Sequence, residues 1–237
     1  MNTSNEKKRL IILHSKPWSS DVFAFANIVF EEGEYDLVCI NSKIEFERYE
    51  SFHETDTLLF IHWNWIVPAK ITEEFHCICF HMTDLPFGRG GSPLQNLLIR
   101  GIETTKVSAI KMTQELDAGP VYMKRTLKLT GSAQEIYLRA SQLSLIMAKD
   151  IIRDATLPVK QEGDVVQFER LTYADNEIEE KKVGLNYFIN MVRMLDAATY
   201  PAAYILYGDL KINFENVRED DGLIIGNYSV EANKNAN

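Results

Sequence analysis

Hydrophobic positions along the first 155 residues fall into short runs separated by stretches with helical periodicity. Six of these runs predict strands, over residues 10–14, 35–40, 57–61, 77–80, 107–112 and 124–129. The stretches between and after them predict helices over 22–30, 46–53, 93–100 and 132–154. Alternation of strands and helices is typical of an α/β fold, so we expect a Rossmann-like, mostly parallel sheet with helices on both faces.

The pattern changes after Pro158, which ends the last of these helices. The next 26 residues or so are polar and acidic with little periodicity, and a helical pattern and two alternating segments then follow, over 185–197, 204–214 and 223–230. The sequence therefore predicts three parts and a disordered tail: a main domain over 1–158, a linker over 159–184, a short C-terminal α+β module over 185–237, and the tail from 231.

Two polar residues follow predicted strands in the middle of the chain. His81 ends the apolar run over 77–80, and Asp117 lies two residues before Gly119 in the loop after the run over 107–112. Ligands bind at the carboxyl ends of strands in an open α/β sheet. We therefore expect His81 and Asp117 to share one crevice, although Asp before Gly is also an ordinary turn pattern.

Between these two residues, a glycine-rich loop at 88–91 leads into a helix. Ser92 is a good N-cap, Pro93 suits the first helical position, and Gly101 suits the left-handed position just past the end. Backbone N–H groups at a helix start can hold a phosphate, so the loop predicts an anion site, with a flexible turn as the alternative.

This stretch resembles the signature of the folate-dependent formyltransferases, a family that includes methionyl-tRNA formyltransferase and the nucleotide-sugar N-formyltransferases. The sequence departs from the family pattern at Cys79, where the family has asparagine, and at Asp84, where it usually has leucine. The residues that match the signature are His81, Thr83, Leu85, Pro86, Arg89, Gly90, Gly91, Pro93, Asp117 and Gly119.

The resemblance implies an N-formyltransferase that uses 10-formyltetrahydrofolate as co-substrate. The phrase over 80–97 looks most like enzymes of the pseudaminic-acid pathway, whose acceptor is a UDP-linked 4-amino-4,6-dideoxy sugar. Two alternatives stay open. One is a formyltransferase for a dTDP-amino sugar or another small amine. The other is a catalytically inactive homologue that binds folate or nucleotide.

The resemblance also implies catalytic roles for His81, Asp117 and Cys79. A histidine is the natural proton carrier near neutral pH, and a neighbouring carboxylate can orient it and stabilise its protonated form. The matching family asparagine is expected to stabilise the oxyanion, whereas a thiol is a weak donor. Cys79 is therefore interpreted as a small core residue, with Asn64 or a backbone N–H as donor. Weak donation by the thiol itself, or loss of activity, are the alternatives.

Ligand-binding residues are expected in two sets. The folate pocket is expected to be lined by the loop after the third strand and the loop of Asp117, with the residues Trp63, Trp65, Ile66, Val67, Glu115, Leu116 and Asp117. The alternative for the two tryptophans is that they pack on the sheet edge. The nucleotide sugar is expected to contact Lys16, Trp18, Asp84, Arg89, Gly90, Gly91 and Ser92.

Charge narrows the choice of acceptor. The chain has a net charge of −9, and no stretch of it is strongly basic. Proteins that bind a large folded RNA present several cations to its phosphates, so we expect a small acceptor and no nucleic acid.

Other features of composition set the expected location and exclude a metal. No apolar run is long enough to cross a membrane and the start lacks a signal-peptide pattern, so a cytoplasmic protein is expected. Cys79 and His81 share a strand face, but zinc needs further ligands and no Cys or His follows His81. We expect no metal, and a homodimer is left open.

Overall fold

The computed structural model describes residues 7–31, 34–181 and 184–233. Within these ranges the chain forms two compact units. The first comprises described residues of 1–89, 106–127 and 138–167, and the second those of 90–105, 128–137 and 168–237. Each unit is described by itself below. The domain boundaries at 158 and 184 stay a prediction, since the segment between them contributes to both units.

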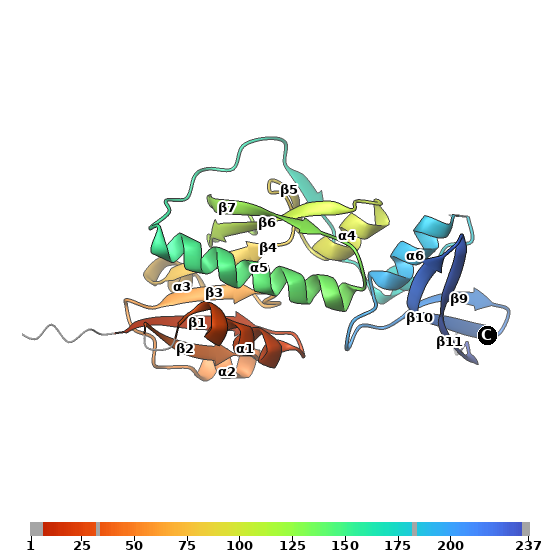
Figure 1. The fold of residues 1–237 in the computed structure, drawn as a ribbon, viewed down its shortest axis with the longest axis horizontal. Helices are drawn as coiled ribbons and strands as arrows, with labels where there is room; N and C mark the ends of the chain where they lie inside the picture. The colour runs from red at the N-terminus through yellow and green to blue at the C-terminus, as the bar shows by residue number, and fades with distance from the viewer. Residues whose placement is uncertain (1–6, 32–33, 182–183, 234–237) are drawn as a thin grey trace, which may run out of the picture. The chain divides into compact units, whose positions relative to one another are not determined.

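A six-stranded sheet forms the centre of the first unit (Figure 1), in the order β2-β1-β3-β4-β6-β7. The first four strands of the sequence run parallel, and β6 pairs antiparallel with β4. The predicted Rossmann-like, mostly parallel sheet is thereby confirmed. The strands are β1 (Lys8–His14), β2 (Tyr35–Ile40), β3 (Thr57–Ile61), β4 (His76–His81), β6 (Thr104–Lys111) and β7 (Val121–Lys128).

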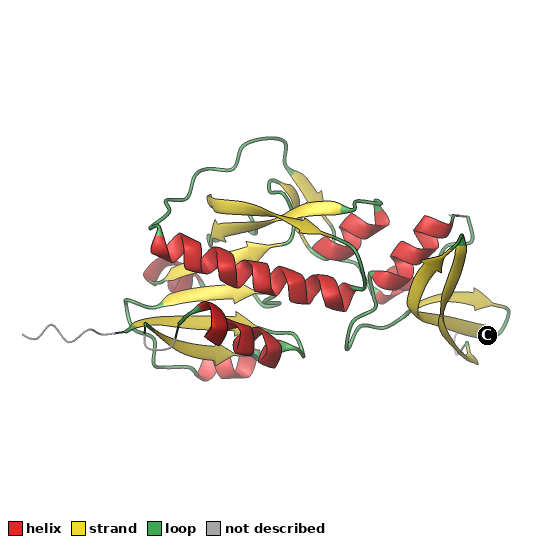
Figure 2. Cartoon of the chain, viewed as in Figure 1, coloured by secondary structure: helices red, strands yellow, loops and turns green. Residues whose placement is uncertain are grey.

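Helices cover both faces of this sheet, as Figure 2 shows. They are α1 (Ser19–Val29), α2 (Lys43–Arg48), α3 (Ala69–Glu74) and α5 (Ala133–Arg153). On one face, Phe46 of α2 joins a core cluster with Leu13, Phe60 and Cys77. On the other, α5 lies close to β1, where Ser141 Oγ is 3.5 Å from His14 Nε2. Because both faces are covered, the central strands are almost wholly apolar and could be predicted as unbroken runs.

The helices α2 and α5 each begin after a serine whose hydroxyl caps them. A capping box begins α5, because Glu135 N–H donates to Ser132 Oγ at 3.3 Å and Ser132 N–H donates to Glu135 Oε2 at 2.8 Å. The helix predicted over 46–53 is wrong in its limits. It begins at Lys43, because Ser42 Oγ accepts from Glu45 N–H, and it ends at Arg48.

The glycine-rich loop and the predicted linker contain further structure. Residues Phe87–Gly90 form a short strand, β5, which pairs with β8 (Val166–Phe168). A 3₁₀ helix, η1 (Tyr173–Asn176), follows, and Phe168 and Ile178 are buried. Few apolar residues mark this segment, so its packing was not visible as periodicity.

The second unit contains α4 (Pro93–Ile99), α6 (Leu185–Arg193) and an antiparallel sheet in the order β11-β10-β9. The three strands are β9 (Ala203–Tyr207), β10 (Leu210–Asp220) and β11 (Leu223–Ala232). The rings of Phe188 on α6 and Phe214 on β10 lie 5.0 Å apart. The expected C-terminal α+β module is therefore present. Its last strand extends into the tail predicted to be disordered, of which 234–237 lie outside the described residues.

Among the helices of the described ranges, none is long and apolar enough to cross a membrane.

Candidate active site

His81 and Asp117 are brought together in the first unit. His81 is the last residue of β4, and its Nδ1 lies 3.4 Å from Asp117 Oδ1. Its Nε2 lies 2.8 Å from the carbonyl oxygen of Gly88. Only 8% of the His81 side chain and 9% of the Asp117 side chain are exposed. Carboxylate and carbonyl oxygens both accept, so a ring that carries a proton on each nitrogen satisfies both partners.

The route by which Asp117 reaches His81 differs from the one expected. Because β6 is antiparallel to β4, its carboxyl end at Lys111 pairs with Ile78 and not with the end of β4. The argument from parallel strand ends was therefore wrong for this strand. The loop after β6 folds back instead, held by Met112 N–H on the carbonyl of Cys77 at 3.0 Å.

Two backbone features shape this returning loop. Asp117 adopts a left-handed conformation with φ 52°, which is uncommon for a residue with a side chain. At Gly119, an added Cβ would lie 1.8 Å from the carbonyl oxygen of Lys111. Only glycine fits there, which gives the predicted Asp-x-Gly pattern a steric reason.

The turn after β4 fixes the second partner of His81. Thr83 Oγ1 donates to the carbonyl of Gly88 at 3.2 Å. Ser108 Oγ, on β6, donates to the carbonyl of Thr83 at 2.7 Å and accepts from Leu85 N–H at 3.3 Å. Sequence reasoning missed Ser108, although a hydroxyl inside an otherwise apolar strand was a usable signal.

Cys79 lies on the same strand face as His81, two residues earlier. It is partly exposed, yet burial raises the pKa of its thiol far above the ordinary range, and the charge of Asp117 adds to that rise. The thiol therefore stays neutral, which makes it a poor nucleophile and a weak hydrogen-bond donor. Across the ranges that the structure describes, no group of three or more His, Cys, Asp or Glu side chains could hold a metal ion.

With this geometry in place, comparison with known proteins identifies the family. The chain is 38% identical to a solved structure described as methionyl-tRNA formyltransferase from Clostridium thermocellum, with a TM-score of 0.87. The match covers 94% of this chain and 99% of that one. This chain belongs to the formyltransferase family.

Further matches within and near the family agree with this. A family model described as the C-terminal domain of methionyl-tRNA formyltransferase matches residues 173–231. Methionyl-tRNA formyltransferase of Rickettsia massiliae (strain Mtu5) is 29% identical over 161 residues, which cover 65% of this chain and 52% of that protein. The chain thus spans about half the length of the curated relatives it matches. A 4-N formyltransferase from Francisella tularensis shares the fold at 16% identity and a TM-score of 0.65, over 95% of this chain and 96% of that one.

The residues predicted to line the folate pocket of this formyltransferase family member are only partly free to contact a ligand. The ring of Trp63 packs edge-on against Phe46 and Trp65, with centroids 5.5 and 4.7 Å away, and Val67 belongs to the core. The alternative of edge packing therefore holds for the Trp63 ring. Its indole N–H, however, is buried and has no hydrogen-bond partner among the described residues.

Two other residues predicted to line the folate pocket are open to solvent. Ile66 is 96% exposed in the loop after β3, and Leu116 is 69% exposed in the loop of Asp117. Exposed apolar side chains and an unpartnered donor such as Trp63 N–H fit a flat heteroaromatic ring that carries acceptors. The residues present thus suit the pterin of a folate.

Several predicted substrate residues are engaged by their neighbours. Trp18 is 5% exposed and packs edge-on to His14, while Lys16, whose N–H lies 3.4 Å from His14 Nδ1, is partly exposed. Asp84 pairs with Lys124 at 2.6 Å and Lys106 at 2.9 Å. Burial acts to raise the pKa of Asp84, but hydrogen bonds from the two lysines hold it below its ordinary value. The substrate roles of these residues stay predictions.

Arg89 is bound to a residue that sequence reasoning missed. Its Nε and Nη2 donate to Gln161 Oε1 at 3.2 and 2.9 Å, and its Nη1 lies 3.4 Å from Glu115 Oε1. Gln161 in turn donates to the carbonyls of Asp117 and Gly119, each at 2.8 Å. Gln161 falls within the predicted linker, where nothing in the sequence pattern pointed to it.

The glycine loop does not present the expected free N–H groups at a helix start. Gly91 N–H donates to the carbonyl of Phe168 at 3.0 Å, and a Cβ at Gly90 would lie 2.3 Å from that same oxygen. Ser92 makes no side-chain cap, because its Oγ accepts from Leu171 N–H at 3.0 Å. Ser92 and Pro93 do occupy the predicted N-cap and first helical positions of α4, but the expected side-chain cap bond is absent, and Gly90 packs closely against Phe168 of β8.

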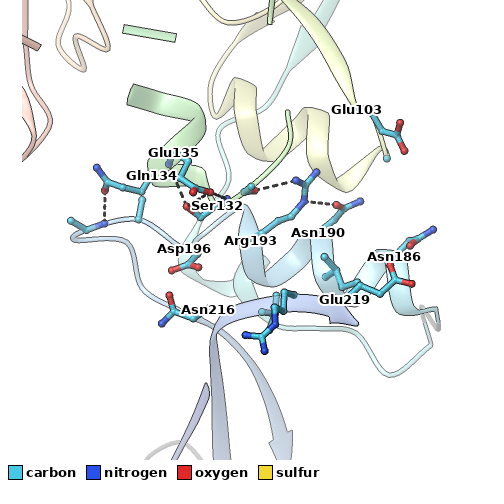
Figure 3. Close-up of a pocket in the computed structure, with 17 residues that line it drawn as sticks. Glu103, Ser132, Gln134, Glu135, Asn186, Asn190, Arg193, Asp196, Asn216 and Glu219 are labelled. Carbon is cyan, nitrogen blue, oxygen red and sulfur yellow. Dashed lines mark hydrogen bonds between the residues drawn. The ribbon is translucent and has the colours of Figure 1, made fainter. Parts of the chain in front are cut away.

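A hollow of about 930 Å³ in the second unit, shown in Figure 3, is lined by more acidic than basic side chains. Arg193 is turned inward and donates to the carbonyls of Leu129 and Gly131 at 2.6 and 3.1 Å. The acidic side chains around it are Glu103, Glu135, Asp196 and Glu219. Burial raises the pKa of Asp196. This lining does not suit a phosphate-rich ligand.

Proposed function

We propose that this chain transfers a formyl group from 10-formyltetrahydrofolate to the amino group of a nucleotide-linked 4-amino-4,6-dideoxy sugar, with a UDP-linked sugar favoured. The observation that carries the reaction type is the buried His81–Asp117 pair in a member of the formyltransferase family. The choice of a nucleotide sugar as acceptor is the more specific part of the proposal and rests on the acidic charge of the chain.

The pair supplies the proton chemistry that formyl transfer needs. Bound 10-formyltetrahydrofolate would supply the formyl carbon that the amine attacks and the nitrogen that leaves protonated. His81 lies between Asp117 Oδ1 and the carbonyl of Gly88, so its protonated ring is held in one orientation. It is suited to pass a proton between amine and leaving nitrogen, and Asp117 stabilises the charge on the ring meanwhile.

The oxyanion needs a donor other than the thiol of Cys79. A neutral thiol donates weakly, and the pKa of this one is raised by burial. Asn64, exposed in the loop between β3 and α3, or a backbone N–H takes that role in our proposal.

Charge supports a small acceptor. Residues 185–237 contain four basic and seven acidic side chains, and the hollow of the second unit is acidic as well. A nucleotide sugar presents two phosphates, which a few cations can neutralise, whereas a tRNA presents many.

A second acceptor has support of a different kind. The relatives in Clostridium thermocellum and Rickettsia massiliae are both described as methionyl-tRNA formyltransferases, and the matched C-terminal model has the same description. Methionyl-tRNA is therefore the acceptor to test against the amino sugar, and dTDP-linked sugars are the next candidates.

The test uses the purified full chain with 10-formyltetrahydrofolate and one acceptor at a time. Acceptors are UDP- and dTDP-linked 4-amino-4,6-dideoxy sugars and methionyl-tRNA, with the formylated product measured by mass. We expect a formylated nucleotide sugar. Product from methionyl-tRNA alone would overturn the acceptor class, and no product from any acceptor would favour the inactive homologue.

A further inference from the structure

One side chain joins three parts of the first unit around the candidate catalytic pair. Gln161 is separated from Asp117 by 44 positions in the sequence and from Arg89 by 72. Its amide nitrogen donates to the carbonyls of Asp117 and Gly119, and its amide oxygen accepts from two nitrogens of Arg89. It therefore bonds the backbone on both sides of Ala118.

The partners leave only one orientation for this amide. Arg89 can only donate, so it must face the amide oxygen, and the two carbonyls can only accept, so they must face the NH₂ group. A flipped amide would set donor against donor and acceptor against acceptor. Arg89 thus fixes the direction in which Gln161 reaches the loop.

The loop that Gln161 bonds contains a residue in an uncommon backbone conformation. Asp117 has φ 52°, and a residue with a side chain persists in this region when its surroundings over-determine it. Within the loop, Ala118 N–H reaches the carbonyl of Glu115 at 3.3 Å, and Thr113 Oγ1 donates to the same carbonyl at 3.1 Å. The two bonds from Gln161 add restraint from outside the loop, on both sides of Ala118 and next to Asp117.

We propose that Gln161 and Arg89 form a clamp that positions the carboxylate of Asp117 against His81. Both are positioning residues for the reaction, and this part of the inference rests on the proposed formyl transfer. Arg89 then acts through Gln161 and the loop, and not through the nucleotide sugar as the sequence suggested. The Arg89 side chain is only 11% exposed, which leaves little of its surface for a ligand.

The test replaces Gln161 by methionine, which keeps the length of the side chain and removes all four hydrogen bonds. We expect kcat to fall by about 10²-fold, the loss that a displacement of around 1 Å causes at a reacting group. The KM values for folate and acceptor should stay within about twofold, since no substrate contact is lost.

The matched control is Gln95→Met in the second unit. Gln95 is buried and donates to Tyr137 Oη and to the carbonyl of Met194, both at 3.1 Å. Its loss should lower the melting temperature and leave kcat unchanged. A Gln161→Met enzyme with wild-type kcat would overturn the proposal.

Arg89→Ala separates the clamp from a substrate contact. The clamp predicts a lower kcat at unchanged acceptor KM, and little further loss when Arg89→Ala is added to Gln161→Met, since both act through one set of bonds. A raised acceptor KM with unchanged kcat would instead restore Arg89 as a substrate residue and overturn the clamp.

A readout without turnover separates failure of the clamp from failure of the proposed function. Hydrogen exchange of a peptide covering 113–120 should quicken in Gln161→Met and stay as in wild type in Gln95→Met. Unchanged exchange in Gln161→Met would overturn the clamp whatever the enzyme does. If wild type formylates nothing, the proposed reaction fails, and the exchange result still decides whether Gln161 holds the loop.

Discussion

Gly119→Ala tests directly whether the position of the Asp117 loop governs catalysis. The new Cβ would begin 1.8 Å from the carbonyl oxygen of Lys111, while an ordinary contact begins near 3.4 Å. The loop must therefore move by roughly 1.6 Å, because the oxygen belongs to a strand backbone and cannot rotate away. Asp117 is two residues away and lies 3.4 Å from His81, so a movement of this size breaks the pair.

The expected loss follows from that displacement. Misplacing a catalytic group by around 1 Å costs about 10²-fold in rate, or about 2.7 kcal/mol of transition-state stabilisation. The assay is steady-state formyl transfer with both substrates varied, alongside thermal unfolding of each variant. We expect kcat to fall and both KM values to stay close to wild type.

Gly101→Ala provides the matched control. Gly101 has φ +70°, and nothing lies within 4 Å of an added Cβ. Alanine there should cost about 1 kcal/mol of stability through backbone strain and leave kcat unchanged. If Gly119→Ala folds cooperatively and keeps kcat within about threefold of wild type, the steric argument for the loop is refuted.

Three further predictions concern residues of the first unit. His81→Ala and Asp117→Ala should each lose about 10²–10⁴-fold in kcat with the fold intact by circular dichroism, and activity within about twofold of wild type contradicts their roles. Cys79→Ala and Cys79→Ser should keep substantial kcat, whereas a loss of about 10²-fold or more would make the thiol the oxyanion donor. Burial, helped by the charge of Lys16, lowers the pKa of His14 from 6.5 to about 4. The unfolded chain therefore binds a proton that the folded chain excludes, and folding stability is lost as pH falls from about 6.5 to about 4. His14→Phe should remove about 3 kcal/mol of the stability lost between pH 7 and pH 4 in urea unfolding, and an unchanged pH dependence would contradict the assignment.

The centre of the sheet could be predicted because its strands are buried on both faces. The run over 57–61 coincides with β3, which is buried from Leu58 to Ile61 because helices cover both faces. The run over 35–40 coincides with β2 at the sheet edge, where Asp36 is exposed. Strand direction could not be obtained in this way. Nothing in the residues of β6 shows that it runs antiparallel to β4. Strand direction depends on the end of the sheet at which the preceding segment enters the strand.

The candidate site was predictable only where a pattern was local. His81 and Asp117 were found because a strand end and an Asp-x-Gly loop are visible in a few residues. Gln161 was not, because its four bonds join segments up to 72 positions apart in a polar stretch. Ser92 shows the converse, since a good local cap was outcompeted by Leu171 N–H from 79 positions away.

The most direct test of the account is a competition between two acceptors. Formyl-labelled 10-formyltetrahydrofolate is mixed with the wild-type chain, a UDP-linked 4-amino-4,6-dideoxy sugar and methionyl-tRNA at equal concentration, with Asp117→Ala run in parallel. The account predicts label on the nucleotide sugar, little on the tRNA, and loss of transfer in the variant. Label on methionyl-tRNA and none on the sugar would contradict the acceptor, and undiminished transfer in Asp117→Ala would contradict the His81–Asp117 mechanism.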